Sequence, residues 1–132
     1  MNAWGRASKR RQNRVNKDLV KCATVSVMEM TYSDMTVPWM GGYRNASQQL
    51  SIFNAGNSQL DGYKKKSYHQ SGNALDVVPY KSKNDTISFY MFAALMFKNW
   101  QKYRFKGELQ WGGHWKKFVD LPHWQVYYPE KA

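Results

Sequence analysis

The feature that most constrains the fold is the apolar segment at residues 87–97. This segment is too short to cross a bilayer, which requires ~20 apolar residues. Asp85 stands before it as a candidate N-cap, and the helix face that residues 86–100 would form is nearly all apolar. A helix of this kind is buried inside a protein. We therefore predict a long central helix at 86–100, with the remainder of the chain packed around it.

Two other segments show helical signals. Ser8 is a candidate N-cap for a first helix that ends before residue 31 and whose apolar residues recur near helical spacing: Val15, Leu19, Cys22 and Val25. A shorter helix is predicted after Asn45, which can cap it, and Gly56 lies just past its expected end.

Strand-like composition occurs in four short segments: TVPW at 36–39, ALDVVP at 74–79, GELQW at 107–111 and HWQVYY at 123–128. Pro79 should close the second segment. Gly41 and Gly42 follow the first one, which indicates a tight bend or a close approach of two backbone segments. The order of elements predicts a single α+β domain in which helices pack on a short antiparallel sheet. Residues 1–7 could form a flexible tail before it.

The composition is that of a folded chain with a basic surface. Of the 132 residues, 42% are hydrophobic, and 20 Lys and Arg residues against 9 Asp and Glu give a net charge of +11. This excess indicates an anionic partner, such as nucleic acid, a membrane surface or an acidic polymer. Cys22 is the only cysteine, which excludes an intramolecular disulfide and a cysteine-rich zinc site. The basic N-terminal segment lacks the apolar run of a signal peptide, so we expect a cytoplasmic protein without stable membrane insertion. We also expect a monomer.

Two pairs of residues have the chemistry of metal ligands. His69 lies seven residues before Asp76, and Asp120 lies three residues before His123. A catalytic zinc ion takes three protein ligands and keeps one open position, and a further acid near that position can accept a proton from water. The two pairs supply two histidines, one ligand aspartate and one spare aspartate. Each pair alone is also compatible with a surface turn.

Three motifs make the chain similar to a known family. The pattern Ser-x-His-x-x-Gly-x-Ala-x-Asp is complete in Ser67, His69, Gly72, Ala74 and Asp76. It resembles the signature of the VanY-like D-alanyl-D-alanine carboxypeptidase family of zinc metallopeptidases. The segments WGGHWKKFVDLPHWQ at 111–125 and GGYRNASQQ at 41–49 are similar to blocks of its L-alanyl-D-glutamate endopeptidase branch, known from bacteriophage endolysins. The resemblance covers roughly residues 8–127.

The resemblance implies a role for each matching residue. His69, Asp76 and His123 match the ligands of a Zn²⁺ ion, which the family fold holds at the face of the sheet. Asp120 matches the acid that serves as general base and then general acid. Arg44 matches an arginine that binds a substrate carboxylate, for which its forked guanidinium is suited. A purely structural pairing of Arg44 with an acid such as Asp61 remains open.

Three further residues have weaker matches. Ser67 matches a residue that binds substrate beside the metal, although it could also serve only as a turn or cap residue. Either Gln48 or Gln49 matches a glutamine of the family, because the register is ambiguous. His114 departs from the family pattern, and it could be a non-ligand near the leaving group, a fourth zinc ligand or a surface residue. A fourth ligand would close the open position that catalysis needs.

The resemblance implies an endolysin-type peptidoglycan hydrolase that cleaves the L-alanyl-D-glutamate bond and lyses the cell. Residues 1–132 would form one catalytic domain without a separate wall-binding domain, which reaches the wall after release from the host cytoplasm through a holin. A D-alanyl-D-alanine carboxypeptidase is the alternative within the same class. A basic nucleic-acid-binding module is the alternative from another class, but no nucleic-acid motif is present.

Overall fold

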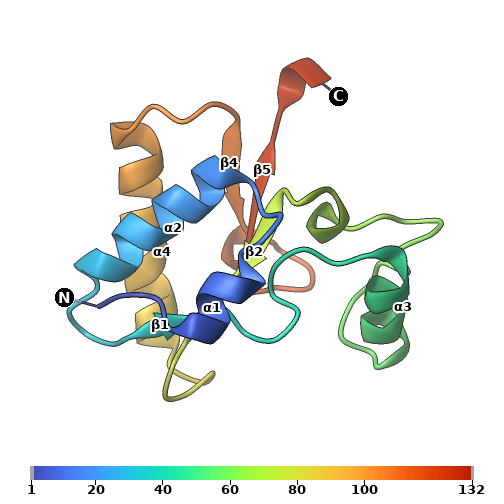
Figure 1. The fold of residues 1–132 in the computed structure, drawn as a ribbon, viewed down its shortest axis with the longest axis horizontal. Coiled ribbons are helices and arrows are strands. Elements are labelled where there is room, and N and C mark those ends of the chain that lie inside the picture. The colour runs from blue at the N-terminus through green and yellow to red at the C-terminus, as the bar shows by residue number, and fades with distance from the viewer. Residues whose placement is uncertain (1, 132) are drawn as a thin grey trace.

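The computed structural model describes residues 2–131 (Figure 1). Its helices are α1 (Arg6–Arg11), α2 (Lys17–Glu29), α3 (Ala46–Asn54) and α4 (Thr86–Lys102). Its strands are β1 (Met35–Thr36), β2 (Ala74–Asp76), β3 (Val78–Pro79), β4 (Glu108–Trp111) and β5 (His123–Tyr127). Three short 3₁₀ turns complete it: η1 (Tyr68–Ser71), η2 (Gly112–His114) and η3 (Pro129–Lys131). The predicted α+β class is confirmed.

The central sheet has three antiparallel strands in the order β2-β5-β4. Trp124 in β5 lies opposite Leu75 in β2 and Trp111 in β4, and these side chains are buried. Because side chains alternate between the two faces of a strand, the residues before and after each of them point to the other face. One face of the sheet therefore joins the core, and the opposite face carries polar side chains.

Helix α4 is the buried helix that the sequence predicts. Asp85 caps it, because its carboxylate accepts a hydrogen bond from the backbone N–H of Ser88 at 3.1 Å. Its inward side chains, Phe92 and Met96 among them, are almost fully buried against α2 and the sheet. The three strands of the central sheet lie between the α2–α4 pair and helix α3, which stands apart on the other side of the molecule (Figure 1). None of the helices among residues 2–131 is long and apolar enough to cross a membrane.

The first predicted helix is interrupted, which corrects its expected start at Ser8. Residue Arg14 has a φ angle of 68°, which ends helical geometry, and Asn16 caps a new helix by accepting hydrogen bonds from two backbone N–H groups of α2. Ser8 lies inside α1, where its hydroxyl bonds Thr36 and the backbone of Val37. The predicted apolar spacing begins only at Val15, after the break, so it could not test whether the helix extends back to Ser8.

Two residues of the segment predicted as a possible flexible tail, Asn2 and Trp4, contact the rest of the domain. Met1 lies outside the described residues, but Trp4 is buried in the core and its indole N–H donates to Thr24 at 2.8 Å. Asn2 also donates a hydrogen bond to the backbone carbonyl of Met30. These contacts could not be predicted because Trp4 precedes any periodic pattern in the sequence.

The segment ALDVVP forms two strands in two sheets instead of one strand. Strand β2 pairs with β5, whereas β3 pairs with β1 in a separate two-stranded sheet that includes Pro79. Between them, the backbone N–H of Val77 donates to the carbonyl of Pro122 at 2.9 Å. The change of partner at this point turns the end of β2 toward the loops that precede α3 and β5.

Gly42 explains the double glycine after the first strand. A Cβ atom on this residue would lie 1.8 Å from the carbonyl oxygen of Arg11. Only glycine allows the two backbone segments to approach this closely. The approach fixes the segment at residues 41–44 against α1, and this segment forms one wall of the site described below.

Candidate metal centre

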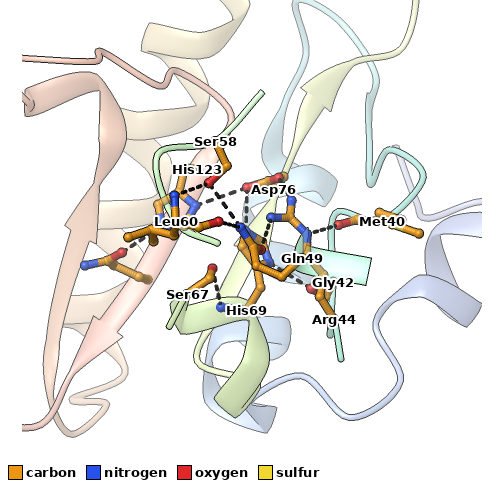
Figure 2. Close-up of polar contacts among 11 residues, drawn as sticks. Met40, Gly42, Arg44, Gln49, Ser58, Leu60, Ser67, His69, Asp76 and His123 are labelled. Atoms are coloured by element: carbon orange, nitrogen blue, oxygen red, sulfur yellow. Dashed lines mark hydrogen bonds and ion pairs between the residues drawn. The ribbon is translucent and has the colours of Figure 1, made fainter. Parts of the chain in front are cut away.

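Three side chains from three separate elements converge on one point (Figure 2). His69 comes from η1, Asp76 ends β2 and His123 begins β5. Asp76 Oδ1 lies 3.2 Å from His69 Nε2 and 3.3 Å from His123 Nδ1, and all three ligand atoms lie within 4.8 Å of one another. Zinc bonds of ~2.05 Å in a tetrahedron place neighbouring ligand atoms about 3.3 Å apart. The two measured separations match that spacing.

The pairing of β2 and β5 brings Asp76 and His123 together. They lie directly opposite each other in the antiparallel register, and both point to the polar face of the sheet. Cross-strand neighbours of this kind have Cβ atoms only ~5 Å apart. Residues 47 positions apart in the sequence are thereby held as one unit.

His69 is held by the local chemistry of its own motif. Ser67 caps η1 by accepting a hydrogen bond from the backbone N–H of His69, and Gln70 completes the capping box. The turn ends at Gly72 in the left-handed conformation, with a φ angle of 79°, and a Cβ there would lie 2.4 Å from the carbonyl oxygen of Arg14. The serine and glycine of the motif therefore shape the turn that buries His69.

Hydrogen bonds fix the tautomer of each imidazole. The Nδ1–H of His69 donates to the carbonyl of Gly42 at 2.7 Å, and the Nε2–H of His123 donates to Oε1 of Gln125 at 2.7 Å. When both rings are neutral, the remaining ring nitrogens, His69 Nε2 and His123 Nδ1, therefore present lone pairs to the carboxylate of Asp76, and when a ring is protonated its nitrogen donates to Asp76 Oδ1 instead. Three electron-pair donors that face one another call for a cation between them, and the set of two imidazoles and a carboxylate suits zinc.

The electrostatics of the cluster agree with this requirement. Burial by itself would raise the pKa of Asp76, but the neighbouring imidazoles lower that pKa well below its usual range. Burial would lower the pKa of His123, but the hydrogen bond and the charge of Asp76 raise it above its ordinary value. The protein therefore favours positive charge beside an ionised carboxylate at this point.

Asp120 lies next to the cluster without joining the three ligands. The backbone N–H of His123 donates to the carbonyl of Asp120 at 3.1 Å, which closes a bend around Pro122. A Cβ on Gly112 would lie 2.2 Å from the same carbonyl oxygen, so this glycine lets the loop pack closely. Desolvation raises the pKa of Asp120, and the charge of Asp76 raises it further.

Arg44 is tied to the metal ligands rather than to Asp61. Its guanidinium donates to Asp76 Oδ2 at 3.1 Å, to the carbonyl of Met40 at 2.7 Å and to Gln49 Oε1 at 3.0 Å. Asp61 instead accepts hydrogen bonds from three backbone N–H groups of its own loop. The open alternative of an Arg44–Asp61 pair is therefore not observed.

The ambiguous glutamine register is resolved by position. Gln49 is fully buried beside Arg44, and its amide N–H₂ donates to Ser58 and to the carbonyl of Leu60. Gln48 belongs to the capping box of α3, where it bonds Asn45. It lines a separate small depression rather than the cleft that contains the cluster.

His114 does not belong to the ligand group. Its ring stacks on Phe97 at 5.4 Å and meets Trp111 edge-on at 5.1 Å, and the residue is exposed. Its exposure fits the surface position among the three roles left open by the sequence, and the described residues that could hold a metal ion are His69, Asp76 and His123, without His114.

The cluster opens into a cleft of about 800 Å³. Ser67, Arg44 and Asp120 line this cleft together with the three ligands, and Trp39 and Phe118 lie exposed at its rim. A cleft of this volume can hold a short peptide. The predicted site residues, apart from Gln48 and His114, are therefore brought together around one opening.

Two supporting groups escaped prediction from the sequence. One is the carbonyl of Gly42, and the other is the side chain of Gln125, each of which orients one ligand histidine. The double glycine signalled a close backbone approach but not its purpose. The alternation of strand residues could have placed Gln125 on the same face as His123.

The chain is similar to two individual proteins. The chain is 35% identical over 85 residues to the L-alanyl-D-glutamate peptidase of Listeria phage A118, a match that covers 64% of this chain and 28% of that protein. It also has the fold of the Serratia marcescens L-Ala D-Glu endopeptidase ChiX, with a TM-score of 0.77 and 24% identity over 99% of this chain and 93% of that one.

A family model also matches nearly the whole sequence. The family described as phage L-alanyl-D-glutamate peptidase matches residues 2–125, which is nearly the whole chain and includes every ligand of the cluster. The family predicted from three sequence motifs is thus confirmed, and the chain belongs to the phage L-alanyl-D-glutamate peptidase family.

Proposed function

We propose that this protein is a zinc-dependent peptidoglycan hydrolase of endolysin type that cleaves the L-alanyl-D-glutamate bond of the stem peptide. The observation that carries the proposal is the convergence of His69, Asp76 and His123, with the spare acid Asp120 on the same cleft. The family and the two relatives are named for this activity. The chain spans 28% of the length of the phage relative, so it would correspond to the catalytic domain.

His69 Nε2, Asp76 Oδ1 and His123 Nδ1 are the atoms that would hold the zinc ion. Three protein ligands leave a fourth position for water or substrate. When bound, the ion supplies Lewis acidity and lowers the pKa of water toward ~7. The hydrogen bonds of Gly42 and Gln125 hold both rings in the tautomer that this arrangement requires.

Asp120 is the residue that would move the proton. Its carboxylate accepts a proton from the attacking water, which then adds to the scissile carbonyl. The protonated side chain afterwards donates that proton to the departing amine of D-glutamate. Desolvation and the charge of Asp76 favour the protonated form of Asp120, which supports its second role as a general acid.

Arg44 is placed to bind a carboxylate of the substrate. A guanidinium has five N–H donors, and three atoms of the protein occupy one each, so about two remain for a ligand. Its bond to Asp76 fixes it beside the cluster, where a D-glutamyl carboxylate would lie. Ser67 and Gln49 would complete this wall, one through its hydroxyl and the other by holding Arg44 in place.

The charge of the chain supports the same substrate. Peptidoglycan is a net anionic polymer, and a protein with a net charge of +11 would be attracted to it at low salt. We infer that residues 1–132 act as one catalytic domain on the wall, as a monomer. Raising the ionic strength should then weaken capture without changing the bond that is cleaved.

Digestion of purified peptidoglycan tests the proposal. The parent protein should release fragments whose new N-terminus, identified by mass spectrometry, is D-glutamate, and a chelator should abolish the release. Released D-alanine would instead show a carboxypeptidase and overturn the assignment of the bond. Absence of any cleavage by zinc-loaded protein would overturn the hydrolase function itself.

Asp120→Asn gives the matching test of the residue roles. The amide keeps the size of the side chain but cannot accept the proton, so turnover should fall by ~100-fold or more while zinc is retained. Glu130→Gln, which neutralises an exposed acid near the C-terminus, is the control for the change in charge. Equal activity of Asp120→Asn and the parent would exclude Asp120 as the acid–base group.

A further inference from the structure

The polar face of the sheet carries a continuous chain of hydrogen bonds that begins at a metal ligand. His123 Nε2–H donates to Gln125 Oε1 at 2.7 Å, and Gln125 Nε2–H donates to Gln110 Oε1 at 2.7 Å. Gln110 Nε2–H then donates to Glu108 Oε1 at 2.8 Å. All three distances are typical of good hydrogen bonds.

The strand register explains why these side chains meet. Gln125 follows His123 by two residues on β5, and Gln110 follows Glu108 by two residues on β4, so each pair shares a face. Gln110 lies directly opposite Gln125 in the antiparallel pairing of β4 with β5. The chain therefore runs from the metal centre to the outer edge of the sheet, where Glu108 is exposed.

The carboxylate at the end gives the chain a single direction. An ionised carboxylate can only accept hydrogen bonds, so Gln110 must turn its N–H₂ toward Glu108 and its oxygen toward Gln125. Gln125 must then turn its N–H₂ toward Gln110 and its oxygen toward His123. An oxygen in that place accepts only from an Nε2–H, so in the neutral ring the lone pair of His123 lies on Nδ1, beside Asp76.

We propose that Glu108, acting through Gln110 and Gln125, is a positioning residue that sets the tautomer of His123 and so keeps Nδ1 available for the metal. The tautomer of His123 is inferred from the hydrogen bonds alone. The effect of this tautomer on zinc binding rests on the proposed function. Groups that orient metal-bound histidines typically change metal affinity by 10–100-fold when they are removed.

The other histidine ligand shows why this chain matters. His69 donates to the backbone carbonyl of Gly42, which is an acceptor whatever side chains surround it. His123 depends on an amide, which can present either its oxygen or its N–H₂. If the direction of these hydrogen bonds were reversed, Gln125 would donate to Nε2 of His123. The proton of His123 would then lie on Nδ1, where it would compete with the metal.

Glu108→Gln is the perturbation that allows this reversal. The new amide has the same shape but can donate as well as accept, so both directions of the chain become available. In metal-free protein at alkaline pH, where the imidazoles are neutral, ¹⁵N NMR of the histidine rings should show His123 only as the Nε2–H tautomer in the parent. The variant should show a mixture with the Nδ1–H form, while His69 stays unchanged.

Zinc affinity gives the second readout, measured by competition with a chelator of known affinity. Glu108→Gln should bind zinc about 10-fold more weakly than the parent. Adding Gln125→Glu to this variant places a carboxylate directly against His123 and should restore both the single tautomer and most of the affinity. Glu130→Gln, with the same change in net charge, should match the parent in both measurements.

The outcomes separate this inference from the proposed function. A single Nε2–H tautomer with unchanged zinc affinity in Glu108→Gln would overturn it, as would failure of Gln125→Glu to rescue, or an equal loss in Glu130→Gln. If the parent itself binds no zinc, the proposed metal centre fails, but the NMR comparison of metal-free proteins still decides whether Glu108 sets the tautomer.

Discussion

Replacing Gly42 by alanine should damage the fold and the metal centre together. The added Cβ would lie 1.8 Å from the carbonyl oxygen of Arg11, whereas ordinary contacts between these atoms are ~3.4 Å. One of the two backbone segments must therefore move by roughly 1.5 Å. Overpacking of this kind typically costs 1–3 kcal/mol, and because both partners here are backbone we expect a value near ~3 kcal/mol.

This cost can be measured by thermal unfolding of metal-free protein. Unfolding entropy of ~2.1 cal/mol/K per residue gives about 0.28 kcal/mol/K for a chain of 132 residues, so ~3 kcal/mol lowers the Tm by about 10 °C. Gly5→Ala is the control, since a Cβ there meets nothing within 4 Å. Its Tm should stay within a few degrees of the parent.

The same substitution should weaken zinc binding. The carbonyl of Gly42 accepts the Nδ1–H of His69, so a shift of this segment loosens the ring that faces the metal. A 10-fold loss of affinity would remove about 1.4 kcal/mol of the stabilisation that excess zinc provides, or about 5 °C of the Tm increase. If Gly42→Ala unfolded at the Tm of the parent, with the same response to zinc, the coupling between this backbone contact and the site would be refuted.

Three other perturbations have defined outcomes. Arg44→Lys should keep zinc content and folding but lower kcat/KM by the equivalent of ~1.5–3 kcal/mol of transition-state stabilisation, because the forked contact to Asp76 and the substrate is lost. Unchanged kinetics would make Arg44 a structural residue. Burial raises the pKa of Cys22 to about 12, so an alkylating reagent at neutral pH should modify it no faster than the protein unfolds, and rapid labelling would contradict the buried position. Hydrogen bonds from Asn99 and Lys98 lower the pKa of Glu29, so its stabilisation is present above the unfolded pKa of ~4.3 and is lost as the pH falls below it. Glu29→Gln should therefore reduce stability by ~0.5 kcal/mol at pH 7, a value discounted for solvent screening, and the difference should shrink in urea titrations as the pH falls through the lowered pKa of Glu29.

Local signals in the sequence predicted the elements whose ends they encode. Asn45 and Asp85 cap α3 and α4 where expected, because a capping side chain acts on the N–H groups of its own next turn. The break before α2 was missed, although Asn16 is an equally good cap, because the helix predicted to begin at Ser8 has apolar spacing that begins only at Val15. Local patterns thus locate helix ends but do not exclude an interruption.

Only those site residues that lie in the recognised motifs could be predicted from the sequence. The three ligands and Asp120 were identified by residue type and resemblance, and the structure brings them to one cleft. What the sequence could not give is the register that pairs β4 with β5, since that pairing depends on contacts between distant segments. The hydrogen bonds that link Gln125, Gln110 and Glu108 depend on this register, so they could not be predicted from the sequence.

The central claim is that His69, Asp76 and His123 hold one zinc ion while Asp120 remains free for catalysis. Zinc content per chain, measured by elemental analysis after removal of unbound metal, tests this most directly in the parent, in His123→Ala and in Asp120→Asn. The account predicts about one zinc in the parent and in Asp120→Asn, and almost none in His123→Ala. A full complement of zinc in His123→Ala, or its loss in Asp120→Asn, would contradict the account.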